Sequence, residues 1–187
     1  MAELQNVFVT VGTDVHPFDR MTDWVDAWAA DGDPAAQLFM QSGTSRVPQK
    51  AEHSPYLSYT EMENRVRDAD AVVCHGGPGT IMLAVALGKM PIVAPRNSSL
   101  GEHVDDHQMA FCARIAADGA ILLAQSEDDF RTHLSCVLKG DALPPRSVSD
   151  SDPAQTAARF EELVNGLFRS PAENAGRVEV LTRRREA

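Results

Sequence analysis

One stretch near the middle of the chain places a histidine, three glycines and a threonine between two apolar segments. Its residues are His75, Gly76, Gly77, Pro78, Gly79 and Thr80. The β-branched, apolar residues 71–74 before it predict a buried strand, and the apolar residues after it predict a helix that ends before Gly88. The three glycines allow the backbone to approach a ligand closely and to adopt positive φ angles.

The start of that predicted helix is a candidate site for a diphosphate. The first N–H groups of a helix and its dipole favour an anion, above all a phosphate. Thr80 is a candidate cap for the helix, and the strand places His75 beside the anion. We interpret the stretch as a diphosphate-binding turn. The alternative is a glycine turn that only packs the helix against the strand.

A second group of polar side chains lies at residues 101–108, after an apolar strand predicted at 91–94. Its members are Glu102, His103, Asp105, Asp106, His107 and Gln108. Carboxylates and amides bind sugar hydroxyls through paired donor and acceptor contacts, although carboxylates at a helix start also serve as solvated caps. Arg96, ahead of this group, could meet the carboxylate of an acidic sugar or pair with Glu102.

The spacing of these residues disfavours a metal site. His103 and His107 are one helical turn apart, but Val104 stands where the zinc-protease motif requires glutamate. We therefore expect no metal ion. The three remaining histidines fit surface or packing positions better than ligand positions, and they are His16, His53 and His133.

A third candidate contact follows the first predicted strand, residues 6–11, where Gly12 and Thr13 could touch a phosphate. An ordinary turn between strand and helix is the alternative. A nicotinamide or flavin site would require the G-x-G-x-x-G motif at this place, and the chain has one glycine there. The Walker loop is also absent from the sequence, and we expect no cofactor.

Apolar strands alternate with helices along the chain, which predicts an α/β fold. Strands are expected at residues 6–11, 37–40, 56–59, 71–74, 91–94 and 120–123, and helices from Pro17, from a Thr60–Glu63 capping box, after the glycine turn, at 104–118 and from Ser126 to Gly140. This pattern indicates a Rossmann-like, doubly wound, mostly parallel sheet that is covered on both faces. Ligands of such sheets bind at the carboxyl ends of the strands, the edge that would carry all three candidate loops.

Length and composition indicate one domain of 187 residues with a net charge of -10. We expect the domain at residues 1–140, a linker at 141–153, a helix at 154–168 and a polar tail at 169–187. The negative charge makes nucleic acid and anionic lipid improbable partners. Three cysteines without metal spacing, and no signal peptide or membrane-length apolar run, favour a cytoplasmic protein with free thiols.

Three segments of the chain, residues 8–13, 75–80 and 101–108, resemble the carboxyl-terminal, donor-binding domain of GT-B glycosyltransferases. They are most similar to the single-domain subunits of two-component transferases, the Alg13-like and exopolysaccharide PssE-like proteins. The resemblance covers about Val7 to Leu123. It implies a nucleotide-sugar donor, usually a uridine diphosphate (UDP) sugar, and inverting transfer without a bound metal in polysaccharide or glycoconjugate synthesis.

The resemblance also implies roles for individual residues. His75 and the turn to Thr80 would hold the diphosphate, with Thr13 touching it from the first loop. Asp106 and Gln108 would hold the donor sugar, with Glu102 and His107 near them. His75 and Glu102 are thus the candidate catalytic residues on this chain. Many relatives carry an acidic residue for the ribose where this chain has Leu83, so its ribose contact must differ.

A partner subunit is a further implication, because the chain has only one Rossmann-like unit. In the resembling systems an Alg14-like or PssD-like subunit associates with the membrane, recruits a lipid-linked acceptor and supplies the general base. That partner would hold this chain at the inner face of the membrane. The chain alone would bind donor and turn over little. A homo-oligomer is an alternative state of the isolated chain. The alternative function is a non-catalytic nucleotide-sugar-binding or regulatory domain.

Overall fold

Six parallel strands form one sheet in the computed structural model, which describes residues 5–31 and 36–141. In chain order they are β1 (Gln5–Thr10), β2 (Ala36–Gln41), β3 (Glu52–Ser54), β4 (Ala71–His75), β5 (Ile92–Ala94) and β6 (Leu122–Leu123). Their order across the sheet is β3-β2-β1-β4-β5-β6, and every pair is parallel. The α/β, doubly wound fold predicted from the sequence is therefore confirmed. The linker, helix and tail expected beyond residue 141 lie outside the described residues.

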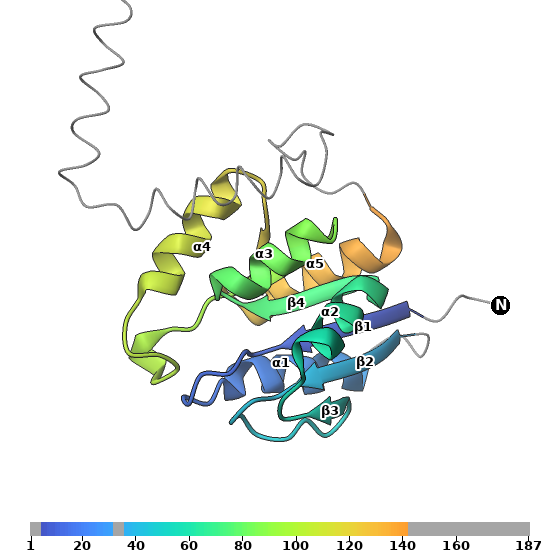
Figure 1. The fold of residues 1–187 in the computed structure, drawn as a ribbon, viewed down its shortest axis with the longest axis horizontal. Coiled ribbons are helices and arrows are strands. Elements are labelled where there is room, and N and C mark those ends of the chain that lie inside the picture. Colours follow the sequence, from blue (N-terminus) through green and yellow to red (C-terminus); the bar gives the residue numbers. More distant parts are fainter. Residues whose placement is uncertain (1–4, 32–35, 142–187) are drawn as a thin grey trace, which may run out of the picture.

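Five helices from the described residues cover the two faces of this sheet (Figure 1). They are α1 (Asp19–Asp31), α2 (Tyr59–Asp68), α3 (Pro78–Ala86), α4 (His107–Ala117) and α5 (Glu127–Lys139), with a short 3-10 helix η1 (Ser98–Leu100) before α4. Helices α1 and α5 pack on one face, and α2, α3 and α4 pack on the other. No helix among the described residues is long and apolar enough to cross a membrane.

The central strands are apolar throughout because both of their faces are buried. In β1, Val7 and Val9 point to the α1–α5 face, whereas Phe8 between them points to the α2–α3 face. In β4, Val73 points to the α1–α5 face, and Cys74 points to the opposite face, under α3 and α4. Successive side chains of a strand point to opposite faces, so a strand covered on both sides needs apolar residues at every position.

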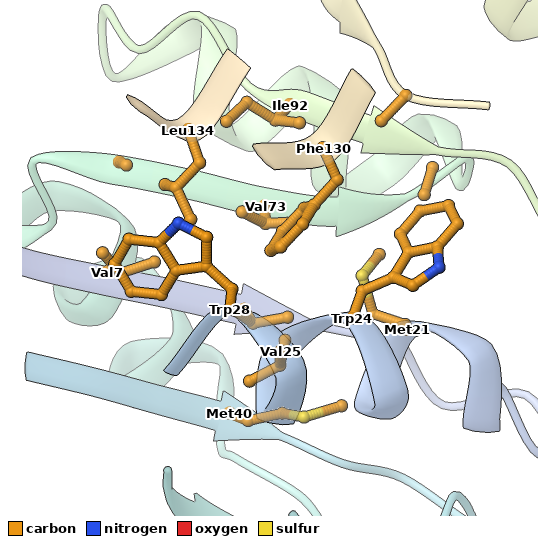
Figure 2. Close-up of a cluster of buried hydrophobic side chains, with 14 of the residues drawn as sticks. Val7, Met21, Trp24, Val25, Trp28, Met40, Val73, Ile92, Phe130 and Leu134 are labelled. Atoms are coloured by element: carbon orange, nitrogen blue, oxygen red, sulfur yellow. The ribbon is translucent and has the colours of Figure 1, made fainter. Parts of the chain in front are cut away.

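The face under α1 and α5 holds a large apolar core (Figure 2). Trp24 and Trp28 of α1 and Phe130 and Leu134 of α5 lie against Val73 and its neighbours. The rings of Trp24 and Phe130 are 5.9 Å apart between centroids. This cluster packs the first helix of the described residues, α1, against the last one, α5, on the same face of the sheet.

Strands β1 and β4 lie side by side at the point where the chain reverses its direction across the sheet. After β1 the chain adds β2 and β3 on one side, and after β4 it adds β5 and β6 on the other. The loops that leave the carboxyl ends of β1 and β4 therefore lead to opposite sides of the sheet, and we call this topological switch point the β1–β4 crevice. Ligands of open α/β sheets bind at this kind of position.

Several element boundaries differ from the sequence prediction. The third strand is Glu52–Ser54, whereas residues 56–59 form a loop and the start of α2. The capping box of α2 uses Ser58 and Glu61 instead of Thr60 and Glu63. The aromatic spacing of 56–59 suggests a strand, but the reciprocal Ser58–Glu61 hydrogen bonds start a helix there.

Two other helices begin later than predicted. Helix α1 starts at Asp19, two residues after Pro17. Helix α4 starts at His107, because η1 and the turns after it occupy the preceding residues. The ends of the helices agree better with the sequence: Gly88, Gly119 and Gly140 all have positive φ angles at the predicted helix ends.

The cysteines are free thiols, as predicted. Cys74 and Cys112 are buried, and burial raises the pKa of both, that of Cys112 to about 12. Cys136 is half-buried.

Candidate functional site

The glycine turn between β4 and α3 is shaped around the side chain of His75. A Cβ atom on Gly12, in the loop after β1, would collide with the imidazole, and so would a Cβ atom on Gly77. The ring therefore lies between the two loops of the β1–β4 crevice. A Cβ atom on Gly76 would lie 2.8 Å from Cys112 Sγ, so this glycine lets α4 pack closely against the turn.

This geometry corrects the expectation of positive φ angles in the turn. Gly12 has a φ of 78°, but Gly76, Gly77 and Gly79 are all absent from the left-handed region. Gly76 and Gly77 are required by space and not by backbone conformation. A side chain on Gly79 would meet open space in the first turn of α3, so this is the position of the turn that stays open to a ligand.

The start of α3 has no side-chain cap. Gly77 is the N-cap residue, and Pro78 occupies the first helical position. Thr80 lies inside the first turn and does not cap the helix, which corrects the sequence prediction. Because the first N–H groups of a helix have no partner within it, this end of α3 presents uncapped donors and the positive end of the helix dipole.

His75 is a neutral imidazole at neutral pH. Burial lowers its pKa to about 4, and the positive charge of Arg96 acts in the same direction. Its Nδ1 atom is buried and has no well-aligned hydrogen-bond partner in the described part of the chain, although a contact of the ring with the Thr10 backbone acts to raise its pKa. Buried polar atoms without partners are rare in folded proteins, so His75 Nδ1 is a group with unused hydrogen-bonding capacity beside the α3 start.

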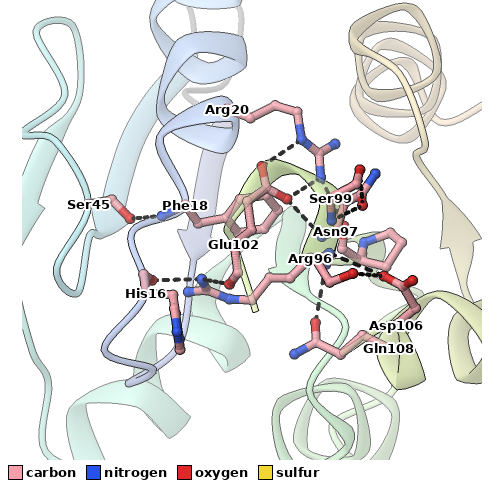
Figure 3. Close-up of polar contacts among 12 residues, drawn as sticks. His16, Phe18, Arg20, Ser45, Arg96, Asn97, Ser99, Glu102, Asp106 and Gln108 are labelled. Carbon is pink, nitrogen blue, oxygen red and sulfur yellow. Dashed lines mark hydrogen bonds and ion pairs between the residues drawn. The ribbon is translucent and has the colours of Figure 1, made fainter. Parts of the chain in front are cut away.

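Arg96 holds the loop after β5 against the loop after β1 (Figure 3). Its guanidinium is fully buried and donates to the backbone carbonyl oxygens of Val11 (2.8 Å), His16 (2.8 Å) and Glu102 (2.9 Å). Arg96 contacts the carbonyl of Glu102 and not its carboxylate, so the carboxylate pair considered from the sequence is not formed. The fully buried side chain fixes two loops.

The carboxylate of Glu102 is buried and neutralised by Arg20 of α1 (Figure 3). Arg20 donates to both carboxylate oxygens at 2.9 and 2.8 Å, and the backbone N–H of Asn97 donates at 2.9 Å. Such a paired carboxylate anchors the β5–α4 loop to α1. Its geometry suits positioning better than proton transfer.

Asp106 and Gln108 lie at the start of α4, where the resemblance places the donor sugar. Asp106 is exposed, and its Oδ1 atom accepts hydrogen bonds from the Ser98 backbone N–H and hydroxyl. Gln108 accepts from the backbone N–H of Arg96 at 3.2 Å, and its side chain packs near Gly76. The two side chains are thus held by the same loop that Arg96 fixes.

Histidines and aspartates of the β1–α1 and β5–α4 loops form a series of side-chain contacts that the sequence interpretation missed. Asp14 lies between two rings, with His16 Nδ1 at 2.7 Å from Oδ1 and His103 Nε2 at 3.5 Å from Oδ2. Asp105 lies between His103 Nδ1 (3.3 Å) and His107 Nδ1 (2.9 Å). The Asp14-x-His16 spacing was the available signal, because an aspartate readily bonds to the residue two places on.

The remaining candidates take no part in this series of histidine–aspartate contacts. Thr13 is exposed in the β1–α1 loop. His53 is exposed on β3, and His133 of α5 contacts the Leu123 carbonyl oxygen at 3.1 Å. Among the residues that the structure describes, no group of three histidine, cysteine, aspartate or glutamate side chains has the geometry to hold a metal ion.

A glycosyltransferase domain family matches most of the chain. The model of the glycosyltransferase family 28 C-terminal domain matches residues 6–164, and the chain belongs to this family. The resemblance to donor-binding domains inferred from the sequence is therefore confirmed. No curated protein matches the chain significantly.

Several solved structures with the same fold are glycosyltransferases of about twice the length. The chain superposes on a kitacinnamycin glycotransferase with a TM-score of 0.55 at 20% identity, covering 88% of this chain and 39% of that one. It superposes on Acinetobacter baumannii MurG with a TM-score of 0.51 at 13% identity, covering 87% and 45%. A solution structure of ALG13 matches with a TM-score of 0.49 at 18% identity, covering 83% of this chain and 96% of that one. The chain thus spans less than half of the first two.

Proposed function

We propose that this chain is the donor-binding catalytic subunit of a two-component inverting glycosyltransferase. It binds a UDP-sugar, and a separate subunit brings a lipid-linked acceptor to the carboxyl edge of the sheet. The observation that supports this most is the crevice between β1 and β4, where the uncapped start of α3, the unpartnered Nδ1 of His75 and the loop of Thr13 meet. All three suit a diphosphate.

The reaction is the attack of an acceptor hydroxyl on the anomeric carbon as the nucleotide diphosphate leaves. Negative charge develops on the leaving diphosphate, and fixed N–H donors at the start of α3 stabilise it without reorganisation. His75 is neutral and contributes through a hydrogen bond instead of a full charge. The acceptor proton passes to a general base, which we place in the partner subunit.

The loop between β5 and α4 holds the donor sugar in this proposal. Asp106 and Gln108 contact sugar hydroxyls from the start of α4, where a carboxylate and an amide offer both donors and acceptors. Glu102 and Arg96 act as positioning residues, because both are buried and engaged by this loop and its neighbours. The partner subunit corresponds to the half of the longer glycosyltransferases that this chain does not cover.

Gly79 permits a direct test of the diphosphate position. Gly79→Asp puts a negative charge in open space at the start of α3. This charge stabilises the helix by about 0.3–1 kcal/mol and repels a diphosphate, so the melting temperature holds or rises while UDP affinity falls at least tenfold. Gly79→Asn has nearly the same shape without the charge and keeps more of the affinity.

The measurement is the UDP affinity of both variants and the wild-type chain by calorimetry, with thermal unfolding as the control for folding. UDP, UDP-glucose and NAD are tested, and NAD is expected not to bind. Equal UDP affinity of Gly79→Asp and wild type would remove the diphosphate from the start of α3. Absence of UDP binding to the wild-type chain at millimolar concentration would contradict a donor-binding role for the isolated subunit.

A non-catalytic nucleotide-sugar-binding domain is the second candidate, and one residue favours it. Leu83, at the position of the acidic ribose ligand in relatives, packs against the apolar cluster of Phe8, Val66 and Val72. The donor ribose therefore lacks a carboxylate from α3. Transfer of sugar on addition of the acceptor-binding subunit separates the candidates, because a non-catalytic domain binds donor and never turns over.

A further inference from the structure

The series of histidine–aspartate contacts joins two loops that flank the proposed diphosphate site. We call Asp14, His16, His103 and Asp105 the two-loop cluster. Asp14 and His16 belong to the β1–α1 loop, and His103 and Asp105 belong to the β5–α4 loop. The rings of His16 and His103 are 6.3 Å apart between centroids. The Asp14 carboxylate is hydrogen-bonded to His16 and lies 3.5 Å from His103 Nε2.

Each histidine of this cluster has a place for a second proton. His16 Nδ1 donates to Asp14 in its neutral form, which leaves Nε2 to accept a proton. His103 Nδ1 accepts from the backbone N–H of Asp105 at 3.3 Å, so its neutral form carries the proton on Nε2, toward Asp14. On protonation, His103 Nδ1 gives up the hydrogen bond from Asp105 N–H, and its new hydrogen faces the Asp105 carboxylate, also at 3.3 Å.

The carboxylates of the cluster are ionised at neutral pH. Burial raises the pKa of Asp14, but the backbone and ring N–H groups of His16 hold it below its usual value. Hydrogen bonds from His107 likewise lower the pKa of Asp105. These two carboxylates present a negative surface, which disfavours a diphosphate.

The cations of this edge do not offset that surface. Apart from the histidines, the two loops carry four carboxylates, on Asp14, Glu102, Asp105 and Asp106. The guanidinium groups beside them are those of Arg96 in the β5–α4 loop and Arg20 of α1. Carboxylates thus outnumber guanidinium groups. Arg20 is paired with Glu102, and Arg96 is fully buried among carbonyl oxygens.

The cluster lies within electrostatic reach of the α3 start. Asp14 raises the pKa of His75 and His103 lowers it, so both act on the ring that flanks the crevice. The groups that face the cluster from other elements are Arg96 after β5, which acts on Asp14, His75 of β4 and His107 at the start of α4. A charge change in the cluster is therefore felt at the proposed diphosphate site.

We propose that His16 and His103 take up protons from solvent when a nucleotide diphosphate binds, and that the resulting imidazolium groups supply the mobile positive charge of this site. This inference rests on the proposed function and adds a proton-linked mode of donor recognition to it. Histidine is the side chain whose charge changes near neutral pH. Each imidazolium is stabilised by an aspartate already in contact with it, and together they cancel the negative surface that the diphosphate meets.

The test uses UDP-glucose, because its diphosphate is a diester and does not titrate near neutral pH. Calorimetry at about pH 7 in two buffers of different ionisation enthalpy gives the number of protons bound with the ligand. For the wild-type chain we expect net proton uptake and an affinity that rises by up to about tenfold per pH unit for each linked proton as the pH falls. His16→Gln and His103→Gln each lose part of the uptake, and the double variant loses most of it.

His53→Gln is the matched control, because His53 is exposed on β3, outside both loops. It is expected to keep the wild-type proton uptake. Asp14→Asn gives a second readout: both rings lose their shared carboxylate, so uptake falls although both histidines remain. Thermal unfolding of every variant verifies that the fold is retained.

The outcomes separate this inference from the proposed function. UDP-glucose binding without proton uptake, or uptake that survives in the double histidine variant, overturns the proton-linked role and leaves donor binding intact. Absence of binding between about pH 6 and 8 contradicts the proposed function itself. Uptake that disappears with His16, His103 or Asp14 and persists in His53→Gln supports the inference.

Discussion

The face under α1 and α5 and the carboxyl edge above β1 and β4 are built on the same strands but held together by different forces. Apolar side chains from two helices fill the first region. Buried polar side chains, each bonded to backbone groups of several loops, hold the second. Apolar packing is non-directional and tolerates substitution of similar volume, whereas a buried hydrogen-bond network fixes one arrangement.

Two side chains do this work at the edge, one on each side of the Gly12 loop. Gln41 at the end of β2 accepts from Gly12 N–H at 3.1 Å and donates to Gly12 and Pro55 carbonyl oxygens at 3.0 and 2.7 Å. Arg96 binds Val11 on the other side. The core therefore sets stability, and the polar ties set the geometry of the site.

The largest expected effect is on the core. Phe130→Ala removes a fully buried ring beside Trp24 and should lower the free energy of unfolding by about 4 kcal/mol, as large-to-small substitutions of buried aromatics do. UDP affinity, measured by calorimetry at low temperature where the variant is folded, should stay within about twofold of wild type. A large loss of affinity in the folded variant would show that the two regions are coupled.

Arg96→Met is the opposite case. It leaves the carbonyl oxygens of Val11, His16 and Glu102 without their donor and should cost about 3 kcal/mol of unfolding free energy, near the cost of breaking a buried charged contact. UDP affinity should fall more than tenfold even where the variant is folded, because both site loops lose their tie. Chemical denaturation and calorimetry measure the two effects. Arg96→Lys should restore part of the affinity, and a Met variant with wild-type affinity would contradict the positioning role.

His75 gives a smaller effect that depends on pH. Its pKa is about 4 in the folded chain against 6.5 for an ordinary histidine, so the unfolded chain takes up a proton that the folded chain refuses. Stability contributed by neutral His75 is complete above about pH 6.5 and is lost as the pH falls to about 4, with a total of about 3 kcal/mol. Denaturant unfolding at several pH values measures it. His75→Asn should flatten this part of the profile, and an unchanged slope would contradict the burial of an uncharged ring.

The fold could be predicted from the sequence because its signals are local and repeated. Apolar runs such as 71–74 need two covered faces, and helix ends such as Gly140 carry their own conformational signature. The glycine turn was located correctly for the same reason. The reason for its glycines was not predictable, because the ring that occupies the space belongs to His75 and one of its walls is Gly12, sixty-three residues earlier by their numbers.

The polar ties were out of reach of the sequence for a related reason. Arg96 bonds to backbone carbonyl oxygens, which every residue has, so no pattern of side chains in the sequence predicts its partners. The Arg20–Glu102 pair joins residues far apart in the chain. His16 was assigned to a surface or packing position because one of its partners, the ring of His103, belongs to a different loop far along the chain.

Substitution of Ser126 tests whether a residue that lies at the carboxyl edge of the sheet, but outside the site, affects donor binding. It begins α5 after β6, at the same edge as the glycine turn, and its hydroxyl accepts from Asp129 N–H at 3.1 Å in a capping box. Ser126→Ala should cost about 1 kcal/mol of unfolding free energy, the usual value of an N-cap. It should leave UDP affinity unchanged, because the side chain of Ser126 is bonded within α5 and not to the Gly12 or Arg96 loops in the described part of the chain. Denaturant unfolding and calorimetry of one sample test both statements. If the affinity fell with this small loss of stability, donor binding would depend on the whole edge and not on the β1–β4 crevice.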